Sequence, residues 1–172
     1  MDEYFSFLIY SSLRSSFLDF FASIFNVVFS FPIFFAFLLV FYVVGINKKR
    51  FVVLFSFLLS SAVTFLIKLI VNRTRPYYGN LNVVNMSSSS FPSGHTSAIF
   101  AVAVILSYYY PKKKYIFYSL GFLIGFFRIY SGAHYLSDVI FGAFLGWVIG
   151  IFVLKHEDKV ENLNKKIQEH IK

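Results

Sequence analysis

The sequence predicts an all-α fold, a polytopic bundle of transmembrane helices, and three observations carry this prediction. Hydrophobic residues make up 58% of the 172 residues and charged residues only 14%, whereas water-soluble domains carry far more charge. The mean hydropathy is +0.68, and several apolar runs approach the length at which a helix crosses a bilayer. The net charge of +8 gathers at the edges of these runs, which favours membrane orientation and anionic lipid over nucleic acid as its partner.

The first predicted element is an N-terminal interfacial helix over residues 16–28. Its apolar residues follow helical spacing, and Ser16 and Asp19 have the spacing of a capping box. Arg14 and Asp19 make a deep position in the bilayer costly, so we expect this helix to lie at the membrane interface. The alternative is that residues 4–28 cross the membrane, which would raise the number of spans from five to six.

Five apolar segments then follow that we interpret as membrane spans. Pro32 interrupts only the start of the first, and Lys68, near the end of the second, can extend its amine to the interface. The connection 72–94 is long, polar and rich in Ser and Asn, and long ordered loops tend to carry function. The predicted spans are residues 29–45, 51–71, 95–110, 115–128 and 135–154.

We predict one domain, residues 1–154, followed by a charged tail, residues 155–172. Apolar residues at helical spacing within the tail predict a solvated or interfacial helix. Lys and Arg gather at residues 48–50, at residues 112–114 and in the tail. The positive-inside rule makes this face cytoplasmic, so the opposite ends of the spans are expected to face outward.

Residues 91–97 read Phe-Pro-Ser-Gly-His-Thr-Ser where the polar connection meets the third span. Proline followed by Ser93, a favourable N-cap residue, and by Gly94 predicts a helix start with free backbone N–H groups. Such a start binds anions, and His95 lies in its first turn. Taken alone, such a stretch is more often an ordinary capped helix with a surface histidine. Whether it binds an anion here therefore depends on the residues elsewhere in the chain.

The span assignment places six ionisable residues at the same outer edge of the membrane. Charged groups beside hydrocarbon are costly, so this gathering indicates a functional site. His134 and Asp138 lie four residues apart across a helix start, where the carboxylate can accept the imidazole Nδ1–H and leave Nε2 as a nucleophile. Three cations suit a phosphoryl transition state, and His95 is free to protonate a leaving oxygen. The six residues are Lys68, Arg75, His95, Arg128, His134 and Asp138.

These residues resemble the signature of the type 2 phosphatidic acid phosphatase superfamily, whose three parts occur here in order over residues 68–138. In the family the third part usually begins Ser-Arg, whereas here Phe127 precedes Arg128, so one hydroxyl contact is missing. The matching parts are Lys68-x6-Arg75-Pro76, Pro92-Ser93-Gly94-His95 and Arg128-x5-His134-x3-Asp138.

The resemblance implies a membrane phosphatase that acts through a phosphohistidine, without a metal or other cofactor. It implies that His134 is the nucleophile, that Asp138 orients it and that His95 is the acid. As substrate it implies a lipid phosphate or diphosphate of a bacterial inner membrane, with undecaprenyl diphosphate, phosphatidylglycerol phosphate and lipid A 1-phosphate as unranked candidates. The implied phosphate-binding residues are Lys68, Arg75, Ser93, Gly94, His95 and Arg128.

Two other functions stay open at this stage. A phosphotransferase on the same fold would pass the phosphoryl group from His134 to another lipid or to a sugar. An anion transporter would use the cations along a pathway, but the spans are apolar at their centres, which argues against a conduit. Arg73 lies near the site but outside the signature, where it either binds an anionic headgroup or merely marks the loop. The sequence is silent on oligomeric state.

Overall fold

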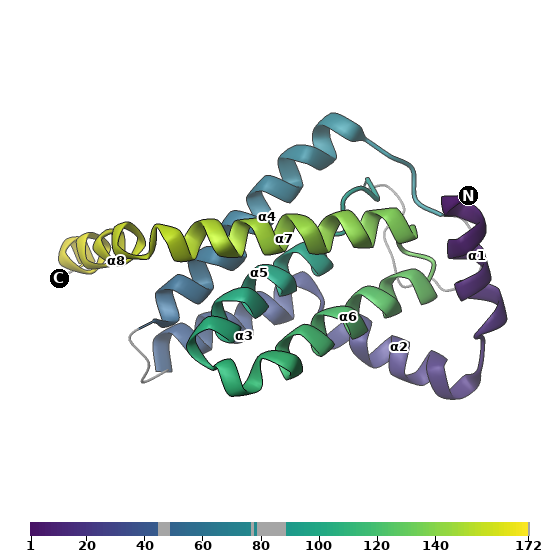
Figure 1. The fold of residues 1–172 in the computed structure, drawn as a ribbon, viewed down its shortest axis with the longest axis horizontal. Helices are drawn as coiled ribbons and strands as arrows, with labels where there is room; N and C mark the ends of the chain where they lie inside the picture. Colours follow the sequence, from purple (N-terminus) through teal and green to yellow (C-terminus); the bar gives the residue numbers. More distant parts are fainter. Residues whose placement is uncertain (45–48, 77, 79–88, 172) are drawn as a thin grey trace.

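The fold is helical throughout the part of the chain that the structure describes, as expected from the sequence. The computed structural model describes residues 1–44, 49–76, 78 and 89–171, so residues 77 and 79–88 of the polar connection and Lys48 lie outside the described residues. The five predicted spans are all observed as helices (Figure 1). The elements are α1 (Asp2–Ser12), α2 (Ser16–Val28), α3 (Phe31–Val44), α4 (Arg50–Val71), α5 (Gly94–Tyr109), the 3₁₀ turn η1 (Pro111–Lys113), α6 (Lys114–Tyr130), α7 (Leu136–Lys155) and α8 (Glu157–Ile171).

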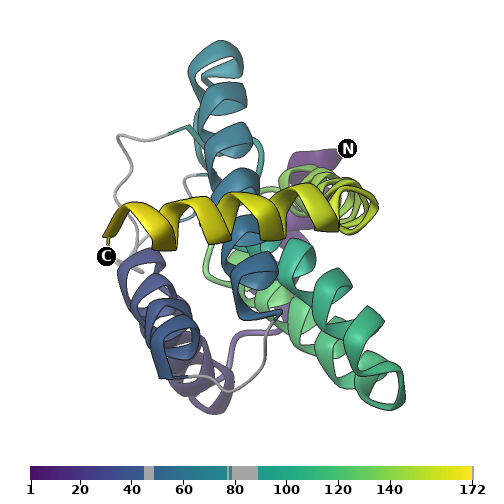
Figure 2. The same cartoon turned by 90° about the vertical axis from the view of Figure 1, so that its left-hand side faces the viewer.

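Helix α5 is the centre of the bundle. Ten consecutive residues, Thr96–Ile105, are buried, and the helix packs against α4, α6 and α7 (Figures 1 and 2). A helix that is apolar on all sides is buried in protein or lipid, and here neighbouring helices surround it. The start of α5, where His95 lies, is therefore held by three other helices.

Glycines on α7 allow it to approach α5 closely. Gly142, Gly146 and Gly150 follow one another at four-residue spacing, and a Cβ atom added to Gly142 would lie only 2.7 Å from the carbonyl oxygen of Ser93. A Cβ on Gly146 would overlap the Ser97 carbonyl oxygen outright. Small residues at this spacing let helix backbones touch in membrane proteins. The close approach brings the first turns of α5 and α7 together.

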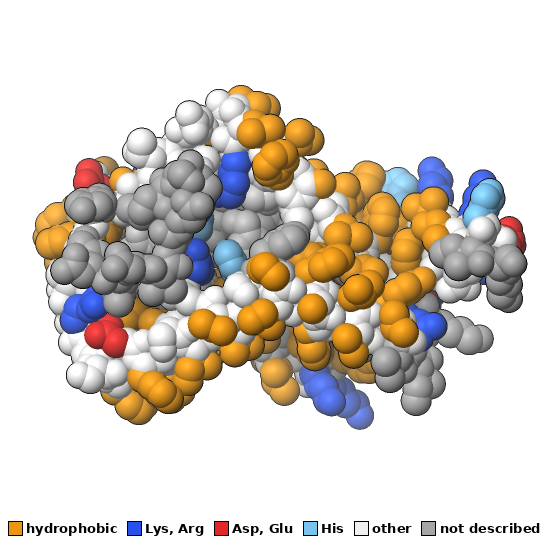
Figure 3. All heavy atoms as spheres, turned by 180° about the vertical axis from the view of Figure 1, so that it is seen from behind, with side chains coloured by type: hydrophobic (Ala, Val, Ile, Leu, Met, Phe, Trp, Pro, Cys, Tyr) orange, Lys and Arg blue, Asp and Glu red, His pale blue; other side chains and the backbone are white. Residues whose placement is uncertain are grey.

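Apolar side chains cover much of the face seen in Figure 3, as in a protein surrounded by lipid. By length and composition, α4 and α7 can cross a membrane. Helix α2 and residues 32–40 of α3 would form a third span, although they bend by 57° relative to each other. Helix α5 is apolar, but with 16 residues it is short for a complete span. The described helices thus supply two or three candidate spans.

The N-terminal region contains more helix than the sequence suggested. The expected helix over residues 16–28 is present as α2, but Ser15 rather than Ser16 caps it. The backbone of Ser15 is extended, and its hydroxyl accepts a hydrogen bond from the N–H of Leu18 at 3.2 Å. The N-cap therefore lies one residue earlier than predicted, and because N3 is then Leu18 the predicted capping box does not form. Helix α1 was not predicted, and it contacts both α6 and α7.

The C-terminal helix α8 packs back onto the bundle. Val160 is buried in the same apolar cluster as α4 and α5, and the hydroxyl of Tyr42 donates a hydrogen bond to Asn164 Oδ1 at 2.8 Å. Lys49 binds both Glu157 and Glu161, and hydrogen bonds to these two carboxylates raise the pKa of Lys49. The division of the chain at residue 154 stays a prediction.

We expect Gly146→Ala to lower the stability of the bundle by about 1–3 kcal/mol, because the added methyl group has no space against the backbone of α5. The measurement is thermal unfolding in detergent. Val148→Ile is the matched control, since it also adds one methyl group to α7 but at a side chain that is 41% exposed. Equal unfolding temperatures for the two variants would contradict the packing role of Gly146.

Candidate functional site

Four helix ends meet at one end of the bundle and carry the predicted site residues. Helices α4 and α6 end there, and helices α5 and α7 begin there. The structure brings together every ionisable residue that the sequence grouped, which are Lys68 in the last turn of α4, Arg75 in the following segment, His95 in the first turn of α5, Arg128 in the last turn of α6, His134 in the α6–α7 connection and Asp138 in the first turn of α7.

The segment after α4 is anchored to the segment before α5. Asn72 ends α4 in the left-handed conformation, with φ of 43°, and its N–H donates to the carbonyl oxygen of Lys68 at 3.0 Å. Farther along, the N–H of Ser90 donates to Arg73 O at 2.8 Å, and the Ser90 hydroxyl donates to Thr74 O at 3.0 Å. These bonds hold the backbone just before Arg75 against Ser90.

Arg75 points inward from this anchored segment, and Lys68 points inward from the last turn of α4. Arg75 Nη1 donates to the carbonyl oxygen of Ala133 at 2.7 Å and lies 3.3 Å from His134 Nε2. The Lys68 amine donates to the carbonyl oxygen of Ser89 at 2.5 Å. The guanidinium thus stands beside the imidazole nitrogen that faces away from Asp138. An anion placed against Arg75 would therefore also meet Nε2.

His134 and Asp138 form the buried pair that the sequence predicted. His134 Nδ1 lies 3.6 Å from Asp138 Oδ2, which is longer than a hydrogen bond, and apo sites commonly show such lengthened pairs. Burial, and then the positive charges of Arg128 and Arg75, hold the pKa of His134 well below its ordinary value. The imidazole is therefore neutral at physiological pH, as a nitrogen nucleophile must be.

Arg128 is buried and is held by a residue that the sequence analysis did not identify. Its Nη1 donates to Asn26 Oδ1 of α2 at 2.7 Å. A polar amide within an apolar helix was the available signal, because such groups are costly unless they have a partner. Phe127, which stands where the family has serine, stacks on Phe25 of α2 with ring centroids 4.7 Å apart. Helix α2 thus contacts both residues.

The start of α5 is shaped to receive an anion. Ser93, the N-cap residue, makes no side-chain capping bond to this helix, so among the described residues the N–H groups of its first turn are available. Ser93 is fully buried, its hydroxyl lies 2.9 Å from that of Thr96, and its N–H donates to the carbonyl oxygen of Asp138 at 3.0 Å. The Ser93 side chain is thus engaged within the protein, whereas Gly94 lines a cavity.

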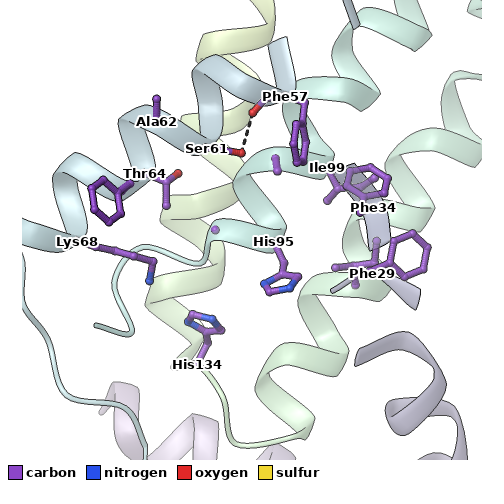
Figure 4. Close-up of a pocket in the computed structure, with 14 residues that line it drawn as sticks. Phe29, Phe34, Phe57, Ser61, Ala62, Thr64, Lys68, His95, Ile99 and His134 are labelled. Carbon is purple, nitrogen blue, oxygen red and sulfur yellow. Dashed lines mark hydrogen bonds between the residues drawn. The ribbon is translucent and has the colours of Figure 1, made fainter. Parts of the chain in front are cut away.

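That cavity has a volume of about 450 Å³ and two chemically different ends. Lys68, Gly94, His95 and His134 line the polar end, and Figure 4 shows the Lys68 amine and both imidazoles pointing toward the same space. The remaining lining is mostly apolar and comes from Phe29, Phe34, Phe57, Phe65, Ile99 and Ile124.

A second cavity of about 470 Å³ adjoins the first and is wholly apolar. The two share Phe29, Phe34 and Ile99, and the second extends between α3 and α5 as far as Leu106. The first cavity begins at the two histidines, and the second, on the other side of these shared side chains, lies farther toward the other end of the bundle.

Arg73, which the sequence left unassigned, also belongs to this region. Its guanidinium binds Asp138 Oδ1 at 2.7 Å and Asp2 Oδ2 at 2.7 Å. The sequence offered no signal for Asp2, because the contact joins residues at distant positions in the chain.

Sequence comparison identifies a matching family and several similar proteins. The PAP2 superfamily matches residues 49–160. Phosphatidylglycerophosphatase B from Bacillus subtilis is 31% identical over 107 residues, which cover 56% of this chain and 52% of that protein. Bacitracin transport permease protein BcrC from Bacillus licheniformis is 33% identical over 89 residues, which cover 48% of this chain and 44% of that protein. The chain spans about half the length of the curated relatives it matches.

Comparison with solved structures also finds a protein of similar fold. The crystal structure of Aquifex aeolicus LpxE superposes with a TM-score of 0.75 at 29% sequence identity, covering 87% of this chain and 92% of that one. The fold, the three signature segments converging on one end of the bundle and the family match over residues 49–160 lead to one conclusion: the chain belongs to the PAP2 superfamily.

Proposed function

We propose that this protein is an integral membrane phosphatase that hydrolyses a phosphomonoester or diphosphate of a membrane lipid. The observation that carries the proposal is the position of His134. Its Nε2 lies 3.3 Å from Arg75 Nη1, and its side chain lines a cavity whose far end is apolar. An imidazole nucleophile beside an arginine, at the mouth of an apolar space, suits a phosphate attached to a hydrocarbon chain.

The proposed reaction has two steps. In the first, Nε2 of neutral His134 attacks phosphorus and the bond to the leaving oxygen breaks. His95, which takes up a proton when the phosphate anion binds beside it, gives that proton to the leaving oxygen. In the second, water attacks the phosphohistidine, His95 accepts a proton from the water, and inorganic phosphate leaves. Asp138 keeps the Nδ1–H of His134 oriented and stabilises the charged ring between the steps.

Positive charge at the site would stabilise the transition state. Lys68, Arg75 and Arg128 are the three proposed cations, and the first-turn N–H groups of α5 after Ser93 complete the cradle. Phosphoryl transfer depends mainly on such positioning and charge. Asp138 is the carboxylate at the centre of the site, and Arg73 already binds it. The proposed mechanism therefore does not use Asp138 as a metal ligand and includes no metal ion.

The apolar cavities support a lipid as the substrate. Undecaprenyl diphosphate, phosphatidylglycerol phosphate and lipid A 1-phosphate are the proposed candidates, and each joins a phosphate to long hydrocarbon. We propose that one chain of the substrate enters the cavity below His95 and continues past Ile99, while any other chain stays in the bilayer. The headgroup would then stand at the membrane edge.

We also propose the topology. Helices α3 to α7 would form five spans, with α1 and α2 at the interface and the site on the outer face of a bacterial inner membrane. Basic residues support this orientation, because Arg50 begins α4 and Lys112 and Lys113 follow α5 at the end away from the site. Helix α8 would then lie in the cytoplasm. The alternative, in which residues 4–28 contribute a sixth span, leaves every later loop on the same side.

A phosphotransferase differs from this proposal only in the second step, where another lipid or a sugar would replace water, and product analysis separates the two. An anion transporter is the less favoured alternative. The apolar lining between Ile99 and Leu106 suits hydrocarbon rather than an anion in transit.

Purified protein in detergent should release inorganic phosphate from at least one of the three lipid candidates, and the rate should persist in EDTA. The reason is that protein cations, rather than a bound ion, neutralise the phosphate in this mechanism. The measurement is phosphate release with and without chelator. Loss of activity in EDTA that a divalent ion restores would rule out the metal-free mechanism, and transfer to an added acceptor without phosphate release would favour the phosphotransferase.

The two histidines should differ in their dependence on the leaving group. His134→Ala should be inactive on every substrate, because it removes the nucleophile. His95→Ala should lose about a hundred- to ten-thousand-fold on a lipid alkyl phosphate and recover part of this on an aryl phosphate, whose leaving oxygen needs less protonation. His156→Ala is the control, since that histidine follows the last turn of α7, far along the helix from the site, where its ring bonds to Phe152 O, and it should retain full activity. A phosphoenzyme trapped on His95 would reverse the two roles.

The His134 imidazole should titrate with a midpoint below pH 6.5, its ordinary pKa. Burial and the charges of Arg128 and Arg75 disfavour the imidazolium, so the proton is lost at a lower pH and the neutral nucleophile persists into mildly acidic conditions. The measurement is NMR of protein labelled at histidine, without substrate, with the signal assigned from its loss in His134→Gln. A midpoint at or above 6.5 would contradict the electrostatic description of the site.

A further inference from the structure

Arg73 lies on the side of His134 that faces Asp138, and not on the side of Nε2, the proposed nucleophilic atom. Its Nη1 donates to Asp138 Oδ1 and to the hydroxyl of Ser137, each at 2.7 Å, and its Nη2 donates to Asp2 Oδ2 at 2.7 Å. The guanidinium carbon also lies 4.0 Å from the centre of the Tyr135 ring. Both terminal nitrogens are thus engaged inside the protein, which disfavours the earlier alternative that Arg73 binds a headgroup.

These contacts give the two carboxylate oxygens of Asp138 different partners. Oδ1 accepts from Arg73, while Oδ2 accepts the backbone N–H of Tyr135 at 2.9 Å and faces His134 Nδ1. With Oδ1 bound on one side and Oδ2 on the other, the carboxylate has one preferred rotation. That rotation presents Oδ2 to the imidazole. Without Arg73, the carboxylate would lose its charged partner at Oδ1 and could turn more freely.

Helix α1 supplies the outer part of the same arrangement. Asp2 Oδ1 accepts the N–H of Ser137 at 3.0 Å, and the hydroxyl of Ser6 accepts the N–H of Leu136 at 2.9 Å. These acceptors satisfy N–H groups at the start of α7 that have no partner within the helix. Asp2 therefore fixes the first turn of α7 and the guanidinium together.

The charges within this cluster reinforce one another. Burial opposes the charged forms of both groups, but hydrogen bonds from Ser137 and Arg73 lower the pKa of Asp2. The pKa of Arg73 is raised despite burial, through its bond to Asp2 and the charge of Asp138. Arg73 therefore stays positive between two carboxylates, with Asp2 on the outer side and Asp138 on the inner side.

We propose that Arg73 is a positioning residue that acts through Asp138 on His134, and that Asp2 of α1 holds Arg73 in place. The inference rests on the proposed phosphatase function and deepens it. It extends the pair of His134 and Asp138 to a chain of four groups that runs from the N-terminal helix to the nucleophile. Helix α1 thereby becomes a working part of the site, although it lies outside the three signature segments.

A double-mutant cycle tests the coupling. Arg73→Gln should lower kcat for phosphate release by roughly ten- to a hundredfold, as expected for loss of a charge-assisted hydrogen bond, with KM within about twofold. In an Asp138→Asn background the same change should cost less than about threefold, because the group it acts through is already altered. Arg73→Lys should recover part of the rate, since it retains the charge but loses the fork geometry.

Arg14→Gln is the matched control. Arg14 pairs with Asp19 at 3.3 Å and lies over the ring of Tyr10, so it is a second arginine with an acidic and an aromatic partner at the same end of the bundle. The kcat of the Arg14→Gln variant should equal that of the wild-type protein. Asp2→Asn should lower kcat in the same direction as Arg73→Gln but by less. An equal loss in the wild-type and Asp138→Asn backgrounds, or a loss confined to KM, would overturn the proposal.

A second readout separates this inference from the phosphatase proposal. The NMR signals of the His134 ring nitrogens, recorded without substrate, should shift in Arg73→Gln and stay in place in Arg14→Gln. If the wild-type protein releases no phosphate from any candidate lipid, the proposed function fails, yet the shift still tests the coupling. Unchanged His134 signals in a folded Arg73→Gln protein would refute the coupling even if phosphate release is observed.

Discussion

Burial of charge at the end of an apolar bundle is the constraint on which the rest of this structure depends. A guanidinium or carboxylate beside hydrocarbon is costly unless it has a partner. Arg128 obtains its partner from Asn26 of α2, and Asp138 obtains its partners from Arg73 and the Tyr135 N–H. The short N-terminal helices α1 and α2 therefore contribute to the site as well as packing against the bundle. Helix α2 supplies Asn26 to Arg128 and helix α1 supplies Asp2 to Arg73, and these contacts lower the free-energy cost of the buried charge.

The direction of the helices suits the same end of the bundle. Helices α5 and α7 begin there, so the partial positive charge of their N-termini lies beside any bound anion. Helices α4 and α6 end there, and each carries a cation in its last turn, Lys68 and Arg128. Those cations complement the negative helix ends while also facing the site. The antiparallel arrangement thus concentrates positive potential at one end without a long basic segment in the sequence.

The parts of the structure that sequence reasoning anticipated are those with local causes. Helix α4 was expected from residue 51 and begins at Arg50. Its ends could be predicted because charged residues on both sides of an apolar run indicate where the helix begins and ends. The signature residues were grouped correctly because helix ends must return to the same membrane face. The contact of Asn26 with Arg128 joins residues 102 positions apart, and that of Asp2 with Arg73 joins residues 71 apart. Such pairs follow from how α1 and α2 fold back on the bundle, which no local pattern encodes.

The apolar cavities have a consequence for selectivity. Each methylene group moved from water into protein contributes about 0.8 kcal/mol, so four of them would favour an amphiphile over a water-soluble phosphate ester by roughly two hundredfold. A chain that already lies in the bilayer gains almost nothing by the same transfer, because lipid is as apolar as the Phe29 and Phe34 side chains that line the space. Between two lipids the cavity would therefore discriminate by length and shape, while the strength of binding would come from the charged headgroup.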